Sequence, residues 1–152
     1  MGRFLAAYGL YLAWLVALVA TGGSLYFSEV RGFVPCALCW FQRIFMYPLA
    51  VILGVASFRD DHGVRVYALP LAVVGALIAL FHVLEQNVPG FGAPAMCQVG
   101  APCSAKYINW LGFISIPVLA LTAFSMIILL LALPRADRGR PNPHSSRSAL
   151  EG

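Results

Sequence analysis

The chain contains an uninterrupted apolar stretch, LGFISIPVLALTAFSMIILLLAL, which runs from Leu111 to Leu133 and has no charged side chain. Three other stretches are also mainly apolar: Phe4–Phe27, Trp40–Phe58 and Val66–Leu84. A helix of about 20 apolar residues crosses the roughly 30 Å hydrocarbon core of a bilayer. Because unpaired backbone amides find no partner in lipid, only helices or closed barrels cross it. We therefore predict an all-α integral membrane protein, a bundle of four transmembrane helices.

The distribution of charge supports a membrane location. Apolar residues make up 61% of the chain and charged residues only 11%, whereas about a quarter of a typical soluble domain is charged. Of the 16 charged residues, only Arg43 lies inside the four apolar stretches. The apolar content excludes disorder of the whole chain, and the lack of a basic stripe excludes a nucleic-acid-binding domain. We expect membrane lipid as the surroundings and no nucleic-acid partner.

The loops and flanks of the apolar stretches carry an uneven share of positive charge, and this bias orients membrane helices. Seven arginines fall on the side of both termini: Arg3, Arg59, Arg65, Arg135, Arg138, Arg140 and Arg147. Only Arg31 and Lys106 fall on the other side. We therefore place both termini in the cytoplasm and loops 28–39 and 85–110 outside it. A cleaved signal peptide is the rival interpretation of the first stretch, but its 24 apolar residues exceed the usual core of about 7 to 15.

Prolines and the C-terminal segment complete the domain organisation. Pro48, Pro70 and Pro117 lie inside apolar stretches, where neighbouring helices can satisfy the freed carbonyl groups, so we expect kinks and no extra loops. Residues 134–152 combine Pro, Gly, Ser and Arg without apolar periodicity. We expect a transmembrane domain over residues 1–133 and a disordered, basic cytoplasmic tail over residues 134–152.

All four cysteines fall in the two predicted outer loops: Cys36 and Cys39 in the motif CALC, Cys97 and Cys103 in CQVGAPC. Thiols outside the cytoplasm are driven toward disulfides, so the placement indicates two redox pairs, although four cysteines allow three pairings. A C-x-x-C bridge closes too short a loop to remove much chain entropy, which makes it a poor structural staple. Its spacing is instead typical of thiol pairs that interconvert readily with the disulfide.

Two other interpretations of the cysteines remain open. One is a zinc site built from all four, but five residues separate the second pair, zinc motifs usually have two to four, and no histidine lies in either loop. The other is a pair of structural disulfides that staple the loops. We favour redox chemistry and predict no metal.

Polar residues near the first cysteine pair are further candidates. Cys39 directly precedes the expected N-terminus of the second helix, where the helix dipole stabilises a thiolate. Arg43 shares one helix face with Cys39 and lies a turn deeper, so it either stabilises an anion there or extends to the headgroups. His82 lies at the outer end of the third stretch, where its imidazole can bind a carbonyl oxygen, pass a proton or face the headgroups. Gln42 is a weaker candidate.

Two motifs together resemble one known family. The string PCALCWFQRIFMYP from Pro35 to Pro48, with the later pair Cys97 and Cys103 and the string YINWLGFISIP that ends at Pro117, is similar to the DsbB family of disulfide bond formation proteins. The short second loop resembles the BdbC-like branch. The resemblance covers the four apolar stretches and both outer loops.

The resemblance implies a quinone-dependent thiol oxidoreductase in the bacterial cell membrane, with redox loops facing the periplasm or cell exterior. It would reoxidise a thioredoxin-like (DsbA-like) thiol oxidase and pass the electrons to ubiquinone or menaquinone, supporting disulfide formation in exported proteins. The implied disulfides are Cys36–Cys39, next to the quinone, and Cys97–Cys103, facing the partner, with Cys97 the favoured point of attack. Arg43 would hold the quinone, and His82 and Gln42 are further candidates for its site.

Two rival functions belong to different classes. A vitamin K epoxide reductase-like protein also joins cysteine pairs to quinones in a helical bundle. Its redox C-x-x-C, however, belongs to a late helix, whereas here the motif precedes the second. A non-enzymatic membrane protein with disulfide-stapled outer loops would tolerate replacement of Cys36 and Cys39.

Overall fold

The computed structural model describes residues 2–88 and 115–132, with side chains from residue 8 onward, and this part of the chain is helical without strands. The long helices are α1 (Gly2–Leu25), α2 (Ala37–Arg59), α3 (Arg65–Asn87) and α4 (Ile116–Ala132). Two short turns accompany them, a π-helical turn at Tyr26–Val30 and a 3-10 turn at His62–Val64. The all-α prediction is therefore confirmed for these residues.

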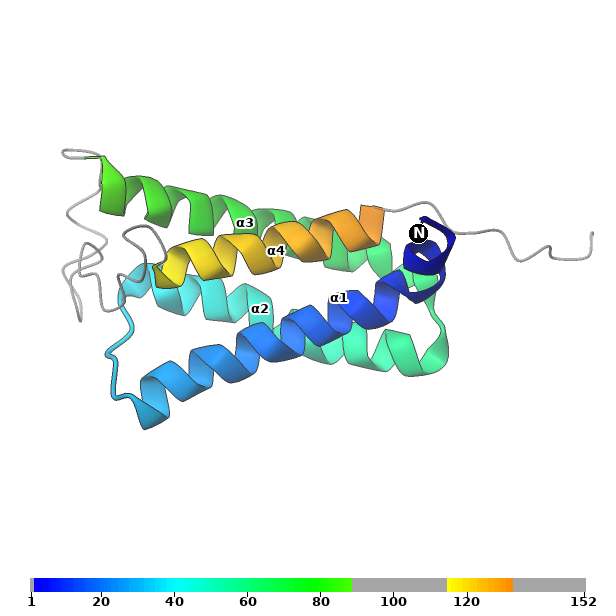
Figure 1. Ribbon diagram of the computed structural model, residues 1–152, viewed down its shortest axis with the longest axis horizontal. Coiled ribbons are helices and arrows are strands. Elements are labelled where there is room, and N and C mark those ends of the chain that lie inside the picture. Colours follow the sequence, from blue (N-terminus) through cyan, green and yellow to red (C-terminus); the bar gives the residue numbers. More distant parts are fainter. Residues whose placement is uncertain (1, 89–114, 133–152) are drawn as a thin grey trace, which may run out of the picture.

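The four helices lie side by side in one bundle (Figure 1). Each packs against two neighbours in the cyclic order α1, α2, α3, α4, whereas α2 and α4 contact each other only slightly across the bundle. Successive helices run in opposite directions. As a result, the end of α1, the start of α2, the end of α3 and the start of α4 meet at one end of the molecule, which we call the cysteine end because Cys36 and Cys39 lie there.

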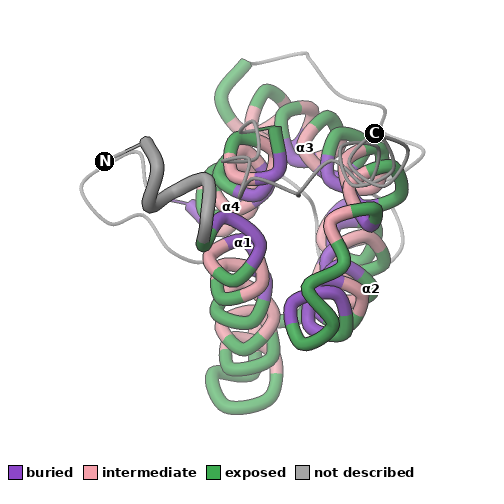
Figure 2. The backbone as a smooth tube through the Cα atoms, turned by 90° about the vertical axis from the view of Figure 1, so that its right-hand side faces the viewer, coloured by how far each residue is buried: buried purple, intermediate pink, exposed green. Residues whose placement is uncertain are grey.

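Small side chains let the helices approach closely, as is common between membrane helices. Ala13, Ala17, Ala68, Ala72 and Ala79 are fully buried at these contacts. Larger apolar side chains fill the remaining core, among them Leu49, Leu53, Phe124 and Ile127. Figure 2 shows the buried positions on the inward faces of the helices and the exposed positions on their outward faces.

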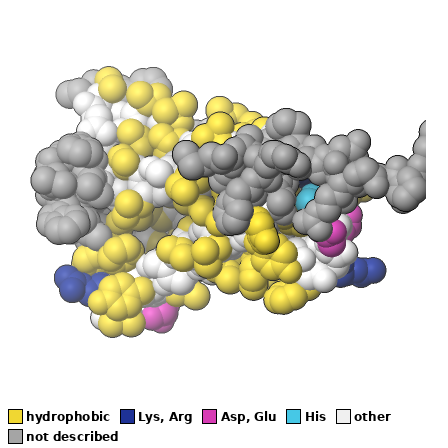
Figure 3. Space-filling view, turned by 45° about the vertical axis from the view of Figure 1, so that its right-hand side comes forward, with side chains coloured by type: hydrophobic (Ala, Val, Ile, Leu, Met, Phe, Trp, Pro, Cys, Tyr) yellow, Lys and Arg dark blue, Asp and Glu magenta, His cyan; other side chains and the backbone are white. Residues whose placement is uncertain are grey.

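The outward faces are apolar, which suits lipid rather than water. Large apolar side chains that are more than half exposed include Leu15, Val51, Phe58, Val66, Leu77 and Leu129. Figure 3 shows hydrophobic side chains over the middle of one face and charged ones near its two ends. Three helical segments are long and apolar enough to cross a membrane, Tyr8–Val30, Ala37–Arg59 and His62–Asn87, and α4 is a shorter apolar helix. These features are those of a membrane protein.

Several helix boundaries differ from the expected apolar stretches. Helical structure continues past Phe27 to Val30, and α2 begins three residues before Trp40, so the first loop spans residues 31–36 rather than 28–39. At the same end of the molecule α3 extends beyond Leu84 to Asn87. Hydropathy marks the part of a helix that suits lipid, but backbone hydrogen bonds continue through polar residues, which explains the longer helices.

The prolines act differently from one another. Helices α2 and α3 continue through Pro48 and Pro70 without an intervening loop, as expected. Pro117, in contrast, is the second residue of α4, where a missing N–H leaves no helical hydrogen bond unmade, so its predicted position inside a helix is wrong for the described part of α4. Residues 111–114 of the expected fourth stretch and the predicted tail at 134–152 lie outside the described residues.

Candidate active site

The C-x-x-C motif forms the first turn of α2. Cys36 is the N-cap residue and its carbonyl oxygen accepts a hydrogen bond from the Trp40 amide at 3.1 Å. Cys39 is the third residue of the helix, so our expectation that it directly precedes the helix is wrong. Both cysteines are thiols, and their sulfur atoms lie 3.1 Å apart. Both residues therefore lie in the N-terminal turn of α2, at the positive end of its helix dipole, although the Cys36 side chain makes no capping hydrogen bond.

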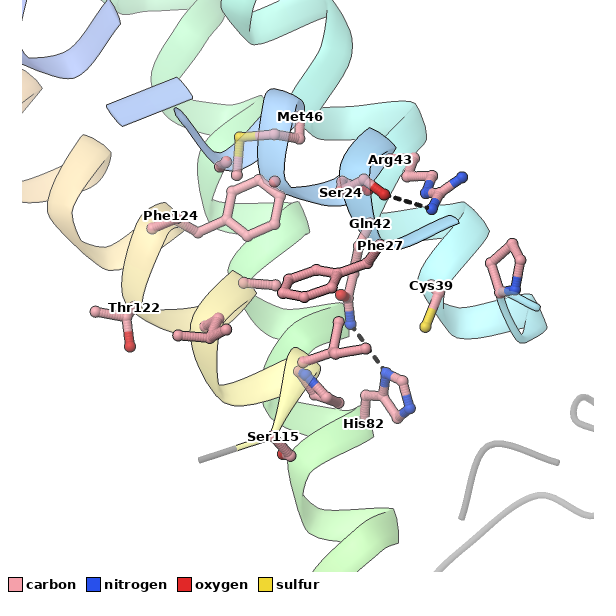
Figure 4. Close-up of a pocket in the computed structure, with 18 of the residues that line it drawn as sticks. Ser24, Phe27, Cys39, Gln42, Arg43, Met46, His82, Ser115, Thr122 and Phe124 are labelled. Carbon is pink, nitrogen blue, oxygen red and sulfur yellow. Dashed lines mark hydrogen bonds between the residues drawn. The ribbon is translucent and has the colours of Figure 1, made fainter. Parts of the chain in front are cut away.

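His82 of α3 reaches across to this turn. Its Nε2 atom lies 3.7 Å from the Sγ atom of Cys36, and its Nδ1 atom lies 3.1 Å from Nε2 of Gln42 on α2. The imidazole is only 1% exposed and Gln42 only 6% exposed. Figure 4 shows the Gln42–His82 hydrogen bond between the two helices. The alternative that His82 faces the headgroups is therefore wrong.

The two partners of Cys36 alter its acidity. A hydrogen bond from the Cys39 thiol, followed by one from His82, lowers the pKa of the Cys36 thiol below its usual value, although burial acts in the opposite direction. The helix dipole alone points to Cys39, whereas the contact that His82 makes across helices acts on Cys36.

Arg43 extends from α2 toward α1. Its guanidinium donates a hydrogen bond to the Ser24 carbonyl oxygen at 3.1 Å and lies 5.4 Å from the centre of the Trp40 ring, above its face. Figure 4 shows Arg43 directed at Ser24, on the same side of α2 as Cys39. The side chain is half-buried. It is thus held within the protein rather than directed only at the headgroups.

A cavity of about 540 Å³ opens beside these residues. Its walls come from all four helices and are mainly apolar, with Phe27, Met46 and Phe124 among them. Polar groups line it as well: Cys36, Cys39, Gln42, Arg43, His82, Gln86 and Ser115. The cavity can therefore take an apolar molecule whose polar groups meet the cysteine end.

The structure brings together five of the seven residues that the sequence singled out: Cys36, Cys39, Gln42, Arg43 and His82. Cys97 and Cys103 lie outside the described residues, so their pairing and the four-cysteine zinc alternative stay untested. Sequence reasoning missed the Ser24 carbonyl that holds Arg43 and the buried Ser115. Neither has a motif that could have revealed it, because a backbone carbonyl and an isolated serine carry no distinctive sequence signal.

Comparison with known proteins supports this description. The family model described as "Disulfide bond formation protein DsbB" matches residues 7–134. Disulfide bond formation protein C of Bacillus subtilis is 56% identical over 129 residues, which cover 85% of this chain and 94% of the relative. A probable disulfide formation protein of Deinococcus radiodurans is 54% identical, covering 83% of this chain and 88% of the relative. No solved structure matches the chain significantly.

A helical membrane bundle with two adjacent thiols at one end, beside an apolar cavity, defines a class of protein, the membrane disulfide oxidoreductases. Within that class the matches are specific: they extend over most of the chain and include both ends of the described bundle. The protein belongs to the DsbB family of disulfide bond formation proteins.

Proposed function

We propose that the protein reoxidises a thioredoxin-like thiol oxidase outside the cytoplasm and passes the electrons to a membrane quinone, supporting disulfide bond formation in exported proteins. One observation carries the proposal: the Cys36–Cys39 thiol pair lines an apolar cavity together with the Arg43 guanidinium, at one end of a bundle with a lipid-facing surface. A thiol pair placed in this way can exchange with protein disulfides on one side and with a lipid-soluble acceptor on the other.

The proposed topology has four spans, with both termini in the cytoplasm and the cysteine end outside it. The alternating helix directions support this arrangement, and so do Arg59 and Arg65, which lie at the end of α2 and the start of α3, opposite the cysteine end. In a bacterial cell membrane this orientation exposes the redox residues to the periplasm or the cell exterior, where disulfides persist.

The residues around the cavity fit a quinone. A quinone has an apolar ring and chain with two carbonyl oxygens, and the cavity joins apolar walls to hydrogen-bond donors at Arg43 and Gln42. Its volume of about 540 Å³ lies within the usual range for small-molecule sites, about 300–1,000 Å³. Either ubiquinone or menaquinone meets these requirements. When bound, the quinone supplies a lipid-soluble acceptor for two electrons and two protons.

The chain's own residues then have distinct tasks. Cys39 is the sulfur from which the electron pair leaves, and the Arg43 guanidinium stabilises negative charge that develops in the cavity. Cys36 forms the S–S bond with Cys39 and so restores the disulfide. The dithiol loses two electrons and two protons overall, which balances the reduction of one quinone to one quinol.

The second cysteine pair connects this centre to the partner. A thiolate of the reduced partner attacks the Cys97–Cys103 disulfide, with Cys97 as the proposed point of attack, and the partner's second thiol resolves the mixed disulfide. The reduced loop pair then exchanges with the Cys36–Cys39 disulfide. Each exchange conserves the number of electrons and transfers two electrons to a cysteine pair closer to the cavity.

A coupled assay tests the proposal. The purified full-length protein is mixed with a reduced thioredoxin-like oxidase and short-chain ubiquinone or menaquinone, and quinone absorbance and partner thiols are followed together. We expect one quinone to be lost per partner disulfide formed, and no reaction with Cys36→Ala or Cys39→Ala. Ser57→Ala serves as a matched control, because this buried serine hydrogen-bonds Leu10 far from the cysteines. Failure to reduce either quinone would favour the non-enzymatic, stapled-loop alternative.

A further inference from the structure

The His82 ring is contacted by α2 at both nitrogen atoms. Gln42 presents its amide nitrogen, rather than its amide oxygen, to Nδ1 at 3.1 Å. An amide nitrogen donates hydrogen bonds and does not accept them, so Nδ1 is the acceptor in this contact. A neutral imidazole that accepts at Nδ1 carries its hydrogen at Nε2. The contact with Gln42 therefore selects the tautomer in which Nε2–H is a donor.

That donor faces the first cysteine. The Sγ atom of Cys36 lies 3.7 Å from Nε2, within the range for hydrogen bonds to sulfur, and Cys36 is buried at 4% exposure. A fixed N–H group stabilises a thiolate more than a thiol, because the thiolate is the stronger acceptor. The Cys39 thiol approaches the same sulfur from within α2 at 3.1 Å. Two groups that can donate a hydrogen bond to a Cys36 thiolate therefore lie beside its sulfur.

From this geometry we propose that Gln42 is a positioning residue: it fixes His82 as the Nε2–H tautomer, and His82 in turn holds Cys36 as the thiolate that closes the Cys36–Cys39 disulfide. The inference deepens the proposed function and rests on it for the identity of the electron acceptor. The contact with His82 uses one hydrogen of the Gln42 amide nitrogen, which leaves its second hydrogen for a molecule in the cavity that Gln42 lines.

The Cys36 thiol loses its proton to water when the thiolate forms. The Cys36 thiolate then forms an S–S bond with Cys39, the Cys39 thiol proton is released, and two electrons pass to the quinone of the proposed function. The quinone takes up two protons and becomes quinol. His82 donates a hydrogen bond throughout and keeps its own proton, so the site returns to its starting state after each turnover.

Other titratable groups lie on the elements around Cys36. Those nearest the cysteine end are Cys39 and Arg43 on α2, His82 and Glu85 on α3, and Tyr26, Glu29 and Arg31 around the end of α1, and Tyr47 of α2 lines the same cavity. The described part of α4 contains no titratable side chain. Of these groups, Cys39 and His82 make hydrogen bonds with the Cys36 sulfur. Replacing Cys39 with alanine therefore isolates the contribution of His82 and Gln42.

The test measures Cys36 directly and needs no quinone. Full-length protein carrying Cys39→Ala, Cys97→Ala and Cys103→Ala keeps Cys36 as its single thiol. Its alkylation by iodoacetamide is followed by mass spectrometry between pH 5 and pH 10 in lipid nanodiscs. Adding Gln42→Met or His82→Leu should slow alkylation at pH 6.5 by about tenfold, the effect of a one-unit shift in the midpoint. The plateau rate at high pH should change little.

Two comparisons separate positioning from a purely structural role. Gln42→Met should add nothing further once His82→Leu is present, because Gln42 acts through the imidazole. His82→Gln should recover part of the rate at pH 6.5, since its amide N–H can approach the Nε2 position, while Ser57→Ala should leave the profile unchanged. Circular dichroism and thermal unfolding confirm that each variant is folded.

Either of two outcomes would contradict the proposed role of Gln42. An alkylation profile unchanged by Gln42→Met, or an equal effect of Gln42→Met with and without His82, would show that Gln42 does not act through His82. These outcomes are separate from the fate of the proposed function. A protein that reduces no quinone can still show the shift at Cys36, and a protein that reduces quinone can still lack it.

Discussion

At the scale of single residues, Arg43 shows how a charge is kept inside an apolar helix. Its guanidinium uses the Ser24 carbonyl and the Trp40 ring as partners. A buried or half-buried guanidinium needs such partners, because its removal from water is costly. These contacts also fix its position beside the cavity, one helical turn from Cys39, where a point charge has most effect on a bound anion.

Arg43→Ala should therefore weaken quinone use. Loss of a charged hydrogen-bond donor costs about 1.5–3 kcal/mol, so we expect an apparent KM for quinone raised roughly tenfold or more, with a smaller increase in Arg43→Lys. Steady-state assays with varied quinone and saturating partner thiol measure the effect. An unchanged KM in the alanine variant would assign Arg43 a structural role between α1 and α2.

The acidity of Cys36 leads to a pH prediction for the reduced protein. A lowered pKa means that the thiolate is present above the lowered value and is lost only as the pH falls through it. The Cys39 thiol is the largest cause and His82 a smaller one. Cys39→Ala should thus raise the pH midpoint of Cys36 alkylation more than His82→Leu does. Peptide mass spectrometry resolves the individual thiols, and the reverse order would contradict the geometry.

At the scale of the helices, close packing depends on particular small residues. A methyl group added at Gly75 of α3 would overlap the Phe124 ring of α4, which is fully buried. Gly22 of α1, in contrast, has nothing within 4 Å of the position that a Cβ would take. The two glycines therefore look alike in the sequence but differ in what they contact.

Gly75→Ala should destabilise the bundle. Overpacking of a well-filled core typically costs about 1–3 kcal/mol, because side chains must leave their preferred rotamers. Gly22→Ala should be neutral or slightly stabilising, since alanine has the higher helix propensity. Thermal unfolding of both variants in the same detergent measures the difference. Equal Tm values would mean that α3 and α4 are less closely packed than the structure indicates.

At the scale of the whole molecule, charge and topology act together. The cysteine end and the turn between α2 and α3 lie at opposite ends of the bundle. That turn contains Asp60, Asp61 and His62 and is flanked by Arg59 and Arg65. The proposed orientation therefore places a turn with several charged side chains in the cytoplasm and the first thiol pair near the outer surface.

Cysteine labelling tests the orientation. In a variant that lacks the four natural cysteines, Glu29→Cys should react with a membrane-impermeant maleimide in intact spheroplasts. Asp61→Cys should react only after the membrane is permeabilised. Both positions are exposed, so access across the membrane is the main difference between them. Labelling of Asp61→Cys alone in intact spheroplasts would reverse the proposed topology.

Much of the fold could be predicted from hydropathy, because an apolar stretch that is long enough to cross lipid must satisfy its own backbone hydrogen bonds and therefore forms a helix. The expected stretches match α1, α2 and α3, and the described part of α4 lies inside the fourth. The ends of the helices could not be predicted in the same way. Ser28 and Glu29 continue the helix after α1, because a helical backbone satisfies its own hydrogen bonds whatever the side chain.

The candidate site also has residues that could be predicted from the sequence and residues that could not. The C-x-x-C spacing of Cys36 and Cys39 is visible in the sequence, and so is Arg43, because it is the only charged residue in the four apolar stretches. The roles of Gln42 and His82 are not, since 40 residues separate them and their contact depends on how α2 and α3 are rotated against each other. Hydropathy describes how apolar a helix is, and it contains little information on that rotation.

The sequence by itself determined that the chain is a helical membrane protein, which residue types carry its chemistry and which family it resembles. Those properties follow from the composition, the length of the apolar stretches and the spacing of residues along the chain. Only the tertiary structure decided that His82 and the Cys39 thiol both converge on Cys36, and that Arg43 is held by α1. The physical reason is that hydrogen bonds between helices depend on packing angles and depths, which result from the fit of all four helices together.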